Sequence, residues 1–403
     1  MTNRIKTFTV SIISILSASL AASAAELKPL QDWMQSLVDD GKVVGCMAQI
    51  TQGGKTIFLE SRGDQNLDSD EDLSVDQIVR IYSMSKPITS AAIMQLVEQK
   101  RLGIDDPVSI YIPEFEKVKV FVDGKMKSPK REITIRDLLT HTSGIAYGFS
   151  APDELKPYFE NAWRDVNSLE DAAKKIATLP LAGEPGNDFI YGLSIDVLGR
   201  IIEVVSGQEF GVYLQEHVFT PLAMTDTGFN PSADLDQMLI VKQTDNGLAV
   251  DTEHYEKEAD TLKPKFESGG GGLWSTLNDY SRFCMAMEQL GELDGKRILR
   301  PDTVKFMTQN HLSPGMGVSE LDAWGKQQRF SLGFDLKTPV ETSMGLRGGG
   351  RWSWGGAAST YFYIDPYKDV TAVFATQLFP FNSEMNWEFH HIVLESLAQE
   401  EAK

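Results

Sequence analysis

The sequence predicts an α+β fold: one antiparallel sheet completed by both ends of the chain, with flanking helices and a mainly helical inserted subdomain. Strand-like segments occur at about residues 40–62 and again at about 330–380, whereas helical patterns fill about 104–290. Strands and helices do not alternate along the chain, which argues against a doubly wound parallel sheet. At 403 residues, the chain is long enough to bury a large core.

The first part of the sheet is expected directly after an N-terminal helix. Residues 27–39 carry apolar side chains at the spacing of an amphipathic helix. Residues 43–50 and 55–60 have strand character, and the pair Gly53-Gly54 between them is typical of a hairpin turn. We therefore expect a helix followed by a β-hairpin.

The last third of the chain is expected to complete the sheet. Residues 352–364 and 370–378 are rich in β-branched and aromatic side chains, with Asp365-Pro366 turning between them. Residues 384–399 place apolar side chains along one stripe, which indicates a closing helix.

Helix starts are recognisable in the middle of the chain. A long helix is predicted from near residue 83 to about residue 100. Thr134 is expected to cap a helix over residues 135–139. Thr276, with Asp279 three residues later, predicts a capping box at the start of another helix.

The N-terminus has the layout of a cleaved secretory signal over residues 1–24. Two basic side chains precede an uncharged run, residues 7–25, which ends in the small-x-small pattern Ala22-Ser23-Ala24. Cleavage would leave residues 26–403 as an exported domain, periplasmic or secreted, with no stable membrane insertion. An uncleaved anchor is the alternative, because the run is nearly long enough to span a bilayer.

Composition argues against several partners and cofactors. The net charge of −19 disfavours binding to a phosphate backbone, so no nucleic-acid partner is expected. The six histidines are scattered, and the pair His390-His391 lacks a spaced partner, so neither a metal nor another cofactor is expected. Cys46 and Cys284 lie in apolar surroundings and are expected to be buried free thiols. The sequence does not indicate an oligomeric state.

The stretch "IYSMSK", residues 81–86, places two serines and a lysine within four residues. On a helix, positions three apart are separated by about 60° and positions two apart by about 200°. Ser83 and Lys86 therefore share a face, while Ser85 points away. A lysine held close to a serine and partly desolvated can take the hydroxyl proton. Because Ser-x-x-Lys alone is a weak pattern, its meaning depends on what accompanies it.

Two other segments accompany this pattern. Tyr191 lies between a Pro-Gly turn and a helical run in "PGNDFIYGLSIDVLGRIIE". Near the C-terminus, Trp354 is followed by Gly355 and Gly356 in the strand-like "RWSWGGAASTYFYIDP". Glycine inside a strand usually marks a bulge or a close approach by another group.

This ordered set resembles the serine β-lactamase and penicillin-binding protein superfamily. The order is Ser-x-x-Lys, a tyrosine about a hundred residues later, and a Gly-Gly strand near the C-terminus. The segments "ITIRDLLTHTSGI", "PLAMTDTGF" and "SGGGGLWSTLNDYSRF" extend the resemblance over nearly the whole mature chain. Within the superfamily, the chain is most similar to the β-lactamase-like carboxylesterases, often called family VIII.

Two departures from the antibiotic-handling members favour the esterase branch. Those members have Tyr-x-Asn where this chain has Tyr191-Gly192-Leu193, and Lys-Thr-Gly or a histidine variant where it has Trp354-Gly355-Gly356. Tryptophan offers an apolar face and one N–H, and cannot form a charged bond to a carboxylate. We therefore expect Trp354, Gly355 and Gly356 to bind a small ester or acyl substrate without that anion.

The resemblance also implies a mechanism. Ser83 Oγ attacks the carbonyl, and Lys86 and Tyr191 take its proton and return it to the leaving alkoxide. Backbone N–H groups of Ser83 and Ala357 form the oxyanion hole, and water then hydrolyses the acyl-enzyme with Tyr191 as base. The expected function is an exported serine hydrolase that cleaves carboxylic esters.

Other readings stay open. The enzyme alternatives are a β-lactamase or D-alanyl-D-alanine carboxypeptidase acting on cell-wall peptides, and an acyltransferase. A catalytically silent binding relative is the alternative outside enzymes. His141, in a turn after a helix, is expected to pack rather than to act as a base. The stretch "GLSID" is not a nucleophile elbow, because its last residue is Asp196 and not glycine.

Overall fold

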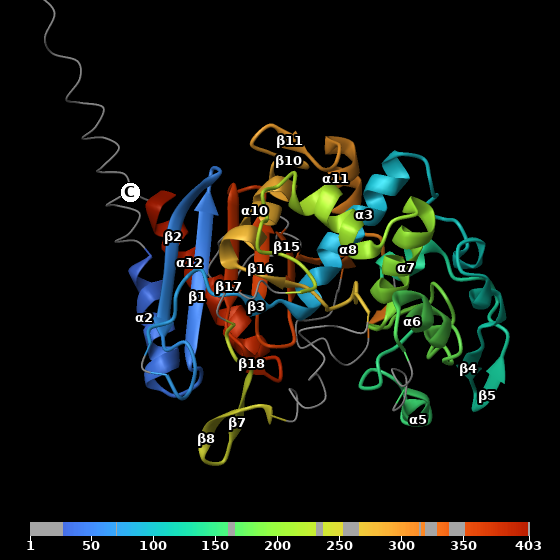
Figure 1. Cartoon of the computed structure of the whole chain (residues 1–403), viewed down its shortest axis with the longest axis horizontal. Coiled ribbons are helices and arrows are strands. Elements are labelled where there is room, and N and C mark those ends of the chain that lie inside the picture. The colour runs from blue at the N-terminus through green and yellow to red at the C-terminus, as the bar shows by residue number, and fades with distance from the viewer. Residues whose placement is uncertain are drawn as a thin grey trace, which may run out of the picture.

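Seven strands form one antiparallel sheet that joins both ends of the described chain (Figure 1). The structure is a computed structural model that describes residues 27–69, 71–159, 166–230, 237–252, 266–313, 316–318, 329–337 and 351–401. In spatial order the strands are β13 (Arg329–Phe330), β14 (Asp335–Lys337), β15 (Arg351–Gly355), β16 (Tyr361–Asp365), β17 (Val370–Ala375), β1 (Gly45–Gln52) and β2 (Lys55–Gly63). Because β1 pairs with β17, the predicted α+β class with a sheet completed from both ends is confirmed.

Helices cover both faces of this sheet. The helices next to the sheet include α2 (Lys28–Asp39), α10 (Leu277–Glu288) and α12 (Ser383–Glu401). The other helices are α3 (Ser85–Glu98), α4 (Ile135–Leu139), α5 (Lys156–Phe159), α6 (Leu169–Ile176), α7 (Ser194–Ser206), α8 (Phe210–Leu214) and α11 (Pro301–Met307), and α5, α6 and α7 lie away from the sheet (Figure 1). On one face, Met34 of α2 and Phe389 of α12 share a buried cluster with Ile50 of β1. On the other face, the ring of Tyr280 in α10 lies 5.1 Å from that of Phe362 in β16.

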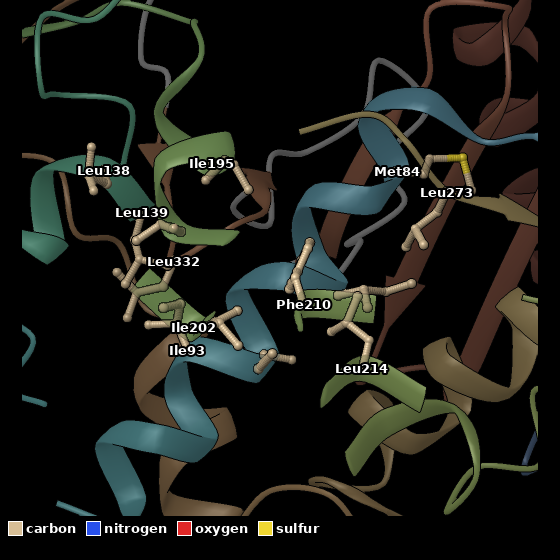
Figure 2. Packing of buried hydrophobic residues seen from close by; sticks show 14 of the residues in the cluster. Met84, Ile93, Leu138, Leu139, Ile195, Ile202, Phe210, Leu214, Leu273 and Leu332 are labelled. Atoms are coloured by element: carbon tan, nitrogen blue, oxygen red, sulfur yellow. The ribbon is translucent and has the colours of Figure 1, made fainter. Parts of the chain in front are cut away.

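Helix α3 is buried along most of its length. Every residue from Ser85 to Leu96 is buried, so the helix has no polar stripe, as expected for an element surrounded by protein. Figure 2 shows Ile93 of α3 beside Ile202 of α7, within the cluster that also contains Leu139 and Phe210. This packing fixes the position of the turn that precedes α3.

Short strands also occur within the middle of the chain, which is therefore less helical than predicted. Among the described residues, short strands, some from outside the middle of the chain, form five small sheets: β3 (Val79–Arg80) with β9 (Trp274–Ser275); β4 (Val120–Val122) with β5 (Lys125–Lys127); β6 (Asp188–Phe189) with β12 (Gly317–Val318); β7 (Val241–Thr244) with β8 (Gly247–Val250) and β18 (Leu378–Phe379); and β10 (Glu292–Leu293) with β11 (Lys296–Arg297). The β3–β9 pair matters for the site, because it brings Leu273 beside Ile81.

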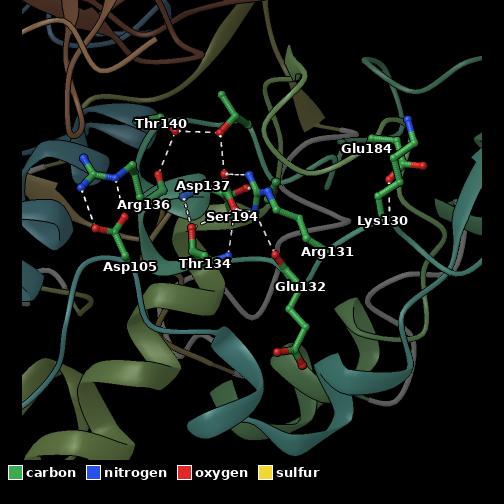
Figure 3. Close-up of polar contacts among 12 residues, drawn as sticks. Asp105, Lys130, Arg131, Glu132, Thr134, Arg136, Asp137, Thr140, Glu184 and Ser194 are labelled. Carbon is green, nitrogen blue, oxygen red and sulfur yellow. Dashed lines mark hydrogen bonds and ion pairs between the residues drawn. The ribbon is translucent and has the colours of Figure 1, made fainter. Parts of the chain in front are cut away.

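The predicted helix over residues 135–139 is confirmed with its cap (Figure 3). The Thr134 hydroxyl accepts a hydrogen bond from the Asp137 N–H, and the Asp137 carboxylate accepts one from the Thr134 N–H at 2.8 Å. Arg131 donates to both oxygens of that carboxylate, at 2.6 and 2.8 Å. Every hydrogen-bonding group that this helix start exposes near its cap thus has a local partner.

Three other predicted elements are corrected in detail. The segment 352–364 is two strands, because the chain turns at residues 356–360, where Ser359 has a φ of +62° and the Gly356 N–H binds the Thr360 carbonyl. The long helix begins at Ser85 and not at residue 83. Thr276 does cap α10, but the Asp279 carboxylate accepts hydrogen bonds from the loop at residues 226–227.

The remaining predictions on the scaffold divide into tested and untested ones. The N-terminal helix, the hairpin at Gly53-Gly54 and the closing helix are confirmed. Cys46 and Cys284 are buried free thiols, as expected. The predicted signal over residues 1–24 lies outside the described residues. Among the residues that the structure does describe, no helix combines the length and apolar character needed to cross a bilayer.

Candidate active site

Ser83 lies in a single 3₁₀ turn, Tyr82–Met84, that leads directly into α3. The Ile81 N–H donates to the Leu273 carbonyl, which ties the start of this turn to the neighbouring strand. Tyr82 has a φ of +43°, a left-handed conformation that costs a bulky residue about 1–3 kcal/mol. Its ring is held by Ala358 and by the Arg80 guanidinium, 4.4 Å from the ring centroid. Strained backbone therefore presents the Ser83 hydroxyl.

Lys86 is buried, with 1% of its surface exposed, and points at Ser83. Its Nζ donates to Ser83 Oγ at 2.9 Å, to the Gly270 carbonyl at 2.6 Å and to the Tyr147 hydroxyl at 3.2 Å. Three acceptors use the three donors of an ammonium group, so the side chain has one well-defined orientation. The predicted closeness of Ser83 and Lys86 is present although Ser83 stands just before the α-helix.

Tyr191 completes the predicted trio. It follows β6 and precedes α7, and its hydroxyl donates to Ser83 Oγ at 2.7 Å. Its ring also lies beneath the Lys86 ammonium, with 4.7 Å between Nζ and the ring centroid. The structure thus brings Ser83, Lys86 and Tyr191 together within hydrogen-bonding distance.

Tyr147 is a member of the site that the sequence did not reveal. Its hydroxyl accepts from Lys86, and its ring lies 5.3 Å from the Tyr191 ring. Burial raises the pKa of Tyr147 well above its usual value, and the neighbouring Tyr191 and Asp196 raise it further. Tyr147 therefore stays a neutral phenol that can accept from the ammonium. The only signal in the sequence was a tyrosine shortly after "HTSG", in a segment without periodicity.

Ser85 is turned away from the site, as predicted. It is fully buried, and its Oγ accepts a hydrogen bond from the Leu273 N–H at 3.2 Å. This serine connects α3 to the residue directly before β9, whereas Ser83 faces Lys86 and Tyr191.

The Gly-Gly segment closes against the turn that carries Ser83. β15 ends at Gly355, and a Cβ placed on Gly356 would come within 2.5 Å of the Ile81 carbonyl oxygen. Glycine is therefore needed at residue 356 for this close approach. Ala357, the next residue, packs in the same small cluster as Tyr82. The oxyanion-hole role of the Ser83 and Ala357 N–H groups stays a prediction.

Trp354 forms an aromatic wall beside the trio. Its ring lies 5.4 Å from Tyr191 and 5.3 Å from Phe330. Its Nε1 is buried and has no hydrogen-bond partner among the residues that the structure describes. Phe149, exposed at 68%, stacks on Tyr147 at 5.1 Å and extends the aromatic surface outward. A Cβ on Gly355 would clash with the Phe381 ring, so this residue has no room for a side chain.

His141 supports the site without contacting Ser83 in any described hydrogen bond. It is fully buried, its ring lies 4.8 Å from Tyr191, and its Nδ1 accepts from the Gly192 N–H at 3.4 Å. Burial, together with the Lys86 charge, lowers the pKa of His141 well below its usual value. The imidazole is therefore neutral and acts as a packing partner of Tyr191.

No grouping of three or more potential metal ligands occurs within the described ranges. The reactive groups that the structure assembles are thus a hydroxyl, an ammonium and two phenols. The site combines the partly buried Ser83 and Tyr191 with the buried Lys86. A serine hydroxyl with a base in hydrogen-bonding reach is the general signature of an activated nucleophile.

Comparison with known proteins agrees with this class. The family model described as Beta-lactamase matches residues 30–395, and the chain belongs to this family. An uncharacterized protein of Mycobacterium tuberculosis is 32% identical over 86% of this chain and 89% of its own length. The lovastatin esterase of Penicillium rubens is 29% identical over 85% of this chain and 91% of its own length.

A solved structure supports the same fold. The chain superposes on "EstCE1, a hydrolase with promiscuous acyltransferase activity" with a TM-score of 0.77 and 24% identity. The superposition covers 94% of this chain and 99% of that one. At this identity the match shows the fold, and the homologous esterases and acyltransferases support an enzyme of the hydrolase class.

Proposed function

We propose that this protein is an exported serine hydrolase that cleaves carboxylic esters through an acyl-enzyme on Ser83. One observation carries the proposal: Ser83 Oγ lies 2.9 Å from Lys86 Nζ and 2.7 Å from the Tyr191 hydroxyl. A serine needs a base at this distance to lose its proton, and two candidate proton carriers surround this hydroxyl.

The proposed reaction has two halves. In the first, the Lys86–Tyr191 pair begins one proton short, with Lys86 as the neutral amine. Ser83 Oγ attacks the ester carbonyl while its proton passes to this pair, and the pair returns the proton to the leaving alkoxide. In the second, water attacks the acyl-serine, Tyr191 accepts the water proton, and the proton returns to Ser83 Oγ as the acid leaves. The N–H groups of Ser83 and Ala357 are proposed to bind the oxyanion in both halves.

The substrate is proposed to be a neutral ester or acyl compound. The wall that the substrate meets consists of the rings of Trp354, Tyr147 and Phe149, and Trp354-Gly355-Gly356 lacks a cation that could bind a carboxylate. This composition disfavours β-lactams and cell-wall peptides, which present a carboxylate to related enzymes. Aromatic walls favour apolar acyl and alcohol groups.

Acyl transfer is the second candidate, and the exposed stack of Phe149 on Tyr147 favours it. An apolar surface beside the acyl-serine can hold an organic alcohol close enough to compete with water for the acyl group. The atoms balance in the same way: the alcohol oxygen bonds the acyl carbon, the bond from that carbon to Ser83 Oγ breaks, and the alcohol proton passes through Tyr191 to Ser83 Oγ.

A substrate panel tests the proposal. The domain without residues 1–24 is incubated with p-nitrophenyl acetate, butyrate and octanoate, with nitrocefin, and with a D-Ala-D-Ala peptide. We expect hydrolysis of the esters and loss of that activity in Ser83→Ala. Rapid turnover of nitrocefin or peptide with inert esters would contradict the ester assignment. Adding an excess of a primary alcohol and measuring ester products separates transfer from hydrolysis.

Export is tested separately from chemistry. The full-length chain is expressed in a Gram-negative host, and the mature N-terminus is determined by mass spectrometry after fractionation. Cleavage close to Ala24 and recovery from the periplasm are expected. An intact N-terminus in the membrane fraction would favour the anchored alternative.

A further inference from the structure

Asp196 is a buried carboxyl group that the proposed mechanism does not use. It is the third residue of α7, five residues after Tyr191, and only 2% of its surface is exposed. A carboxyl group so deeply buried costs several kcal/mol unless it has hydrogen bonds and a counter-charge. Its partners therefore indicate what it is for.

The partners of Asp196 belong to the loop that holds Lys86. Asp196 Oδ1 accepts from the Ser268 hydroxyl at 2.5 Å and from the Gly270 N–H at 3.2 Å. The carbonyl of the same Gly270 accepts the shortest hydrogen bond that Lys86 Nζ donates, at 2.6 Å. Glycine 270 thus binds Asp196 through its N–H and Lys86 through its carbonyl.

The loop fits tightly around this carboxylate. A Cβ on Gly270 would come within 2.6 Å of Asp196 Oδ2, so only glycine allows the two to lie together. On the α3 side, Thr89 Oγ1 donates to the Gly269 carbonyl at 2.9 Å. Asp196 from α7 and Thr89 from α3 therefore hold the loop from two sides, with the Gly270 carbonyl between them and directed at Lys86.

Charge supports the same arrangement. Every hydrogen bond given to Asp196 above is one that the carboxyl accepts, which is the pattern of its ionised form. Burial raises the pKa of Asp196, while the Ser268 hydroxyl, the Lys86 charge and the Gly270 N–H each lower it. Among the described residues, Lys86 contacts Ser83, Tyr147, Tyr191 and the Gly270 carbonyl, and it interacts electrostatically with His141 and with the carboxyl of Asp196. This carboxyl is the natural counter-charge of the buried ammonium.

We propose that Asp196 is a positioning residue for Lys86: through the Gly270 peptide it orients the amine toward Ser83, and its charge balances the ammonium. This inference deepens the proposed function and rests on it. An asparagine oxygen could still accept from Ser268 and Gly270, but bonds to a neutral acceptor are about half as strong as those to a carboxylate. Removing the charge should therefore leave substrate contacts unchanged but hold the Gly270 peptide, and with it the base, less firmly. The expected change is therefore in kcat and in the pH profile, and not in KM.

The test compares two matched aspartates. Asp279 has 1% of its surface exposed and is the third residue of α10, as Asp196 is of α7. Its carboxylate accepts from the Thr227 hydroxyl and the Asp226 N–H, and among the described residues none of its hydrogen bonds involves Lys86 or Gly270. Asp196→Asn is expected to lower kcat on a p-nitrophenyl ester by about 10²-fold, the effect of a small misplacement of a reacting group. Asp279→Asn should lower the melting temperature without changing kcat.

A pH profile distinguishes positioning from general destabilisation. Without the Asp196 anion, the positive charge on Lys86 is no longer balanced, so the neutral amine becomes easier to form. The acid limb of the kcat/KM profile should therefore move to lower pH in Asp196→Asn. Asp279→Asn should keep the wild-type profile. Equal kcat and identical profiles in both variants would overturn the inference while leaving the proposed function intact.

A second variant and a second readout protect the test. Ser268→Ala removes one hydrogen bond to Asp196 without touching Lys86, and it replaces Asp196→Asn if that variant does not fold. It should lower kcat by less than the fall expected for Asp196→Asn. The rate at which a fluorophosphonate labels Ser83 is measured in all variants, since labelling needs the activated serine but no turnover. If Asp196→Asn is labelled more slowly than the wild type but the wild type hydrolyses no ester, the inference is supported and the proposed function is refuted. No labelling of the wild type would overturn both.

Discussion

Two helix starts in this molecule differ in how completely they follow the rules of local stability. α4 begins with a reciprocal cap between Thr134 and Asp137 and an Arg131 side chain bound to both carboxylate oxygens. α3 begins without a side-chain cap, after a tyrosine with a φ of +43° and with a buried lysine in its first turn.

The difference separates a stabilising site from a reactive one. At α4 every feature lowers the free energy of the folded state. At α3 a strained backbone and a buried charge persist because the surrounding core over-determines them, as Figure 2 illustrates for the packing around α3. Substitutions of Ser83 and Lys86 at the α3 start should therefore affect activity more than stability, and substitutions at the α4 start should do the reverse.

The largest expected effect is at the serine itself. Ser83→Ala should lower kcat/KM for a p-nitrophenyl ester by about 10⁴-fold or more, because no nucleophile remains. Ser85→Ala is the control. It removes only the acceptor of the Leu273 N–H, at a cost of about 1–3 kcal/mol, and should keep the wild-type rate. Full activity in Ser83→Ala would refute the whole site assignment.

The next effect is at the two groups that bind the Ser83 hydroxyl. Lys86→Ala and Tyr191→Phe should each lower kcat by about 10²–10⁴-fold, the usual loss when an acid–base group is removed. Stopped-flow kinetics would separate slower acylation from slower deacylation. Near-normal rates in both variants would show that Lys86 and Tyr191 are not acid–base groups, and the proposed functional difference between the α3 and α4 starts would be wrong.

A smaller effect, of the opposite kind, is expected at α4. Thr134→Ala removes the cap and should lower the free energy of unfolding by about 1 kcal/mol, as measured by urea denaturation. Ester hydrolysis by the folded fraction should be unchanged. If kcat fell instead, the α4 start would be part of the reactive region and the proposed division would be wrong.

The last prediction concerns pH and His141, which follows α4 and packs on Tyr191. Its pKa is lowered in the folded chain, so as pH falls below about 6.5 the unfolded chain binds a proton that the folded chain does not. Its contribution to stability is therefore complete above that pH and declines toward pH 5. His141→Asn, which suits the residue's φ of +55°, should show a smaller loss of stability between pH 7 and pH 5 than Thr134→Ala. If both variants lost the same free energy of unfolding between pH 7 and pH 5, His141 would not be the source of this pH dependence.

The elements that follow local rules were predictable from the sequence. The cap at Thr134, the Gly53-Gly54 hairpin and the strand character of the last third depend on neighbouring residues, and all three are present. The different orientations of Ser83 and Ser85 were predictable because Ser83 and Lys86 are only three positions apart.

The rest of the site depends on contacts between distant segments. Tyr147 reaches Lys86 from 61 residues away, and Asp196 reaches Gly270 from 74 residues away. Tyr147 stands outside any periodic pattern, and Asp196 stands in a helical run whose pattern does not tell a functional carboxyl from a solvent-facing one. The 3₁₀ turn at Ser83 was also missed, since it exists because β3 pairs with β9 and fixes residue 81.

The pairing of β1 with β17 also constrains the order in which the chain can fold. Thr51 and Thr371, 320 residues apart, share a hydrogen bond of 2.6 Å across this pair. Until the last strands have been synthesised, the N-terminal hairpin has an unpaired edge and the central sheet cannot close. The sheet therefore assembles late in folding. In a chain that must stay unfolded during transport, this strand order would by itself delay folding until synthesis is nearly complete.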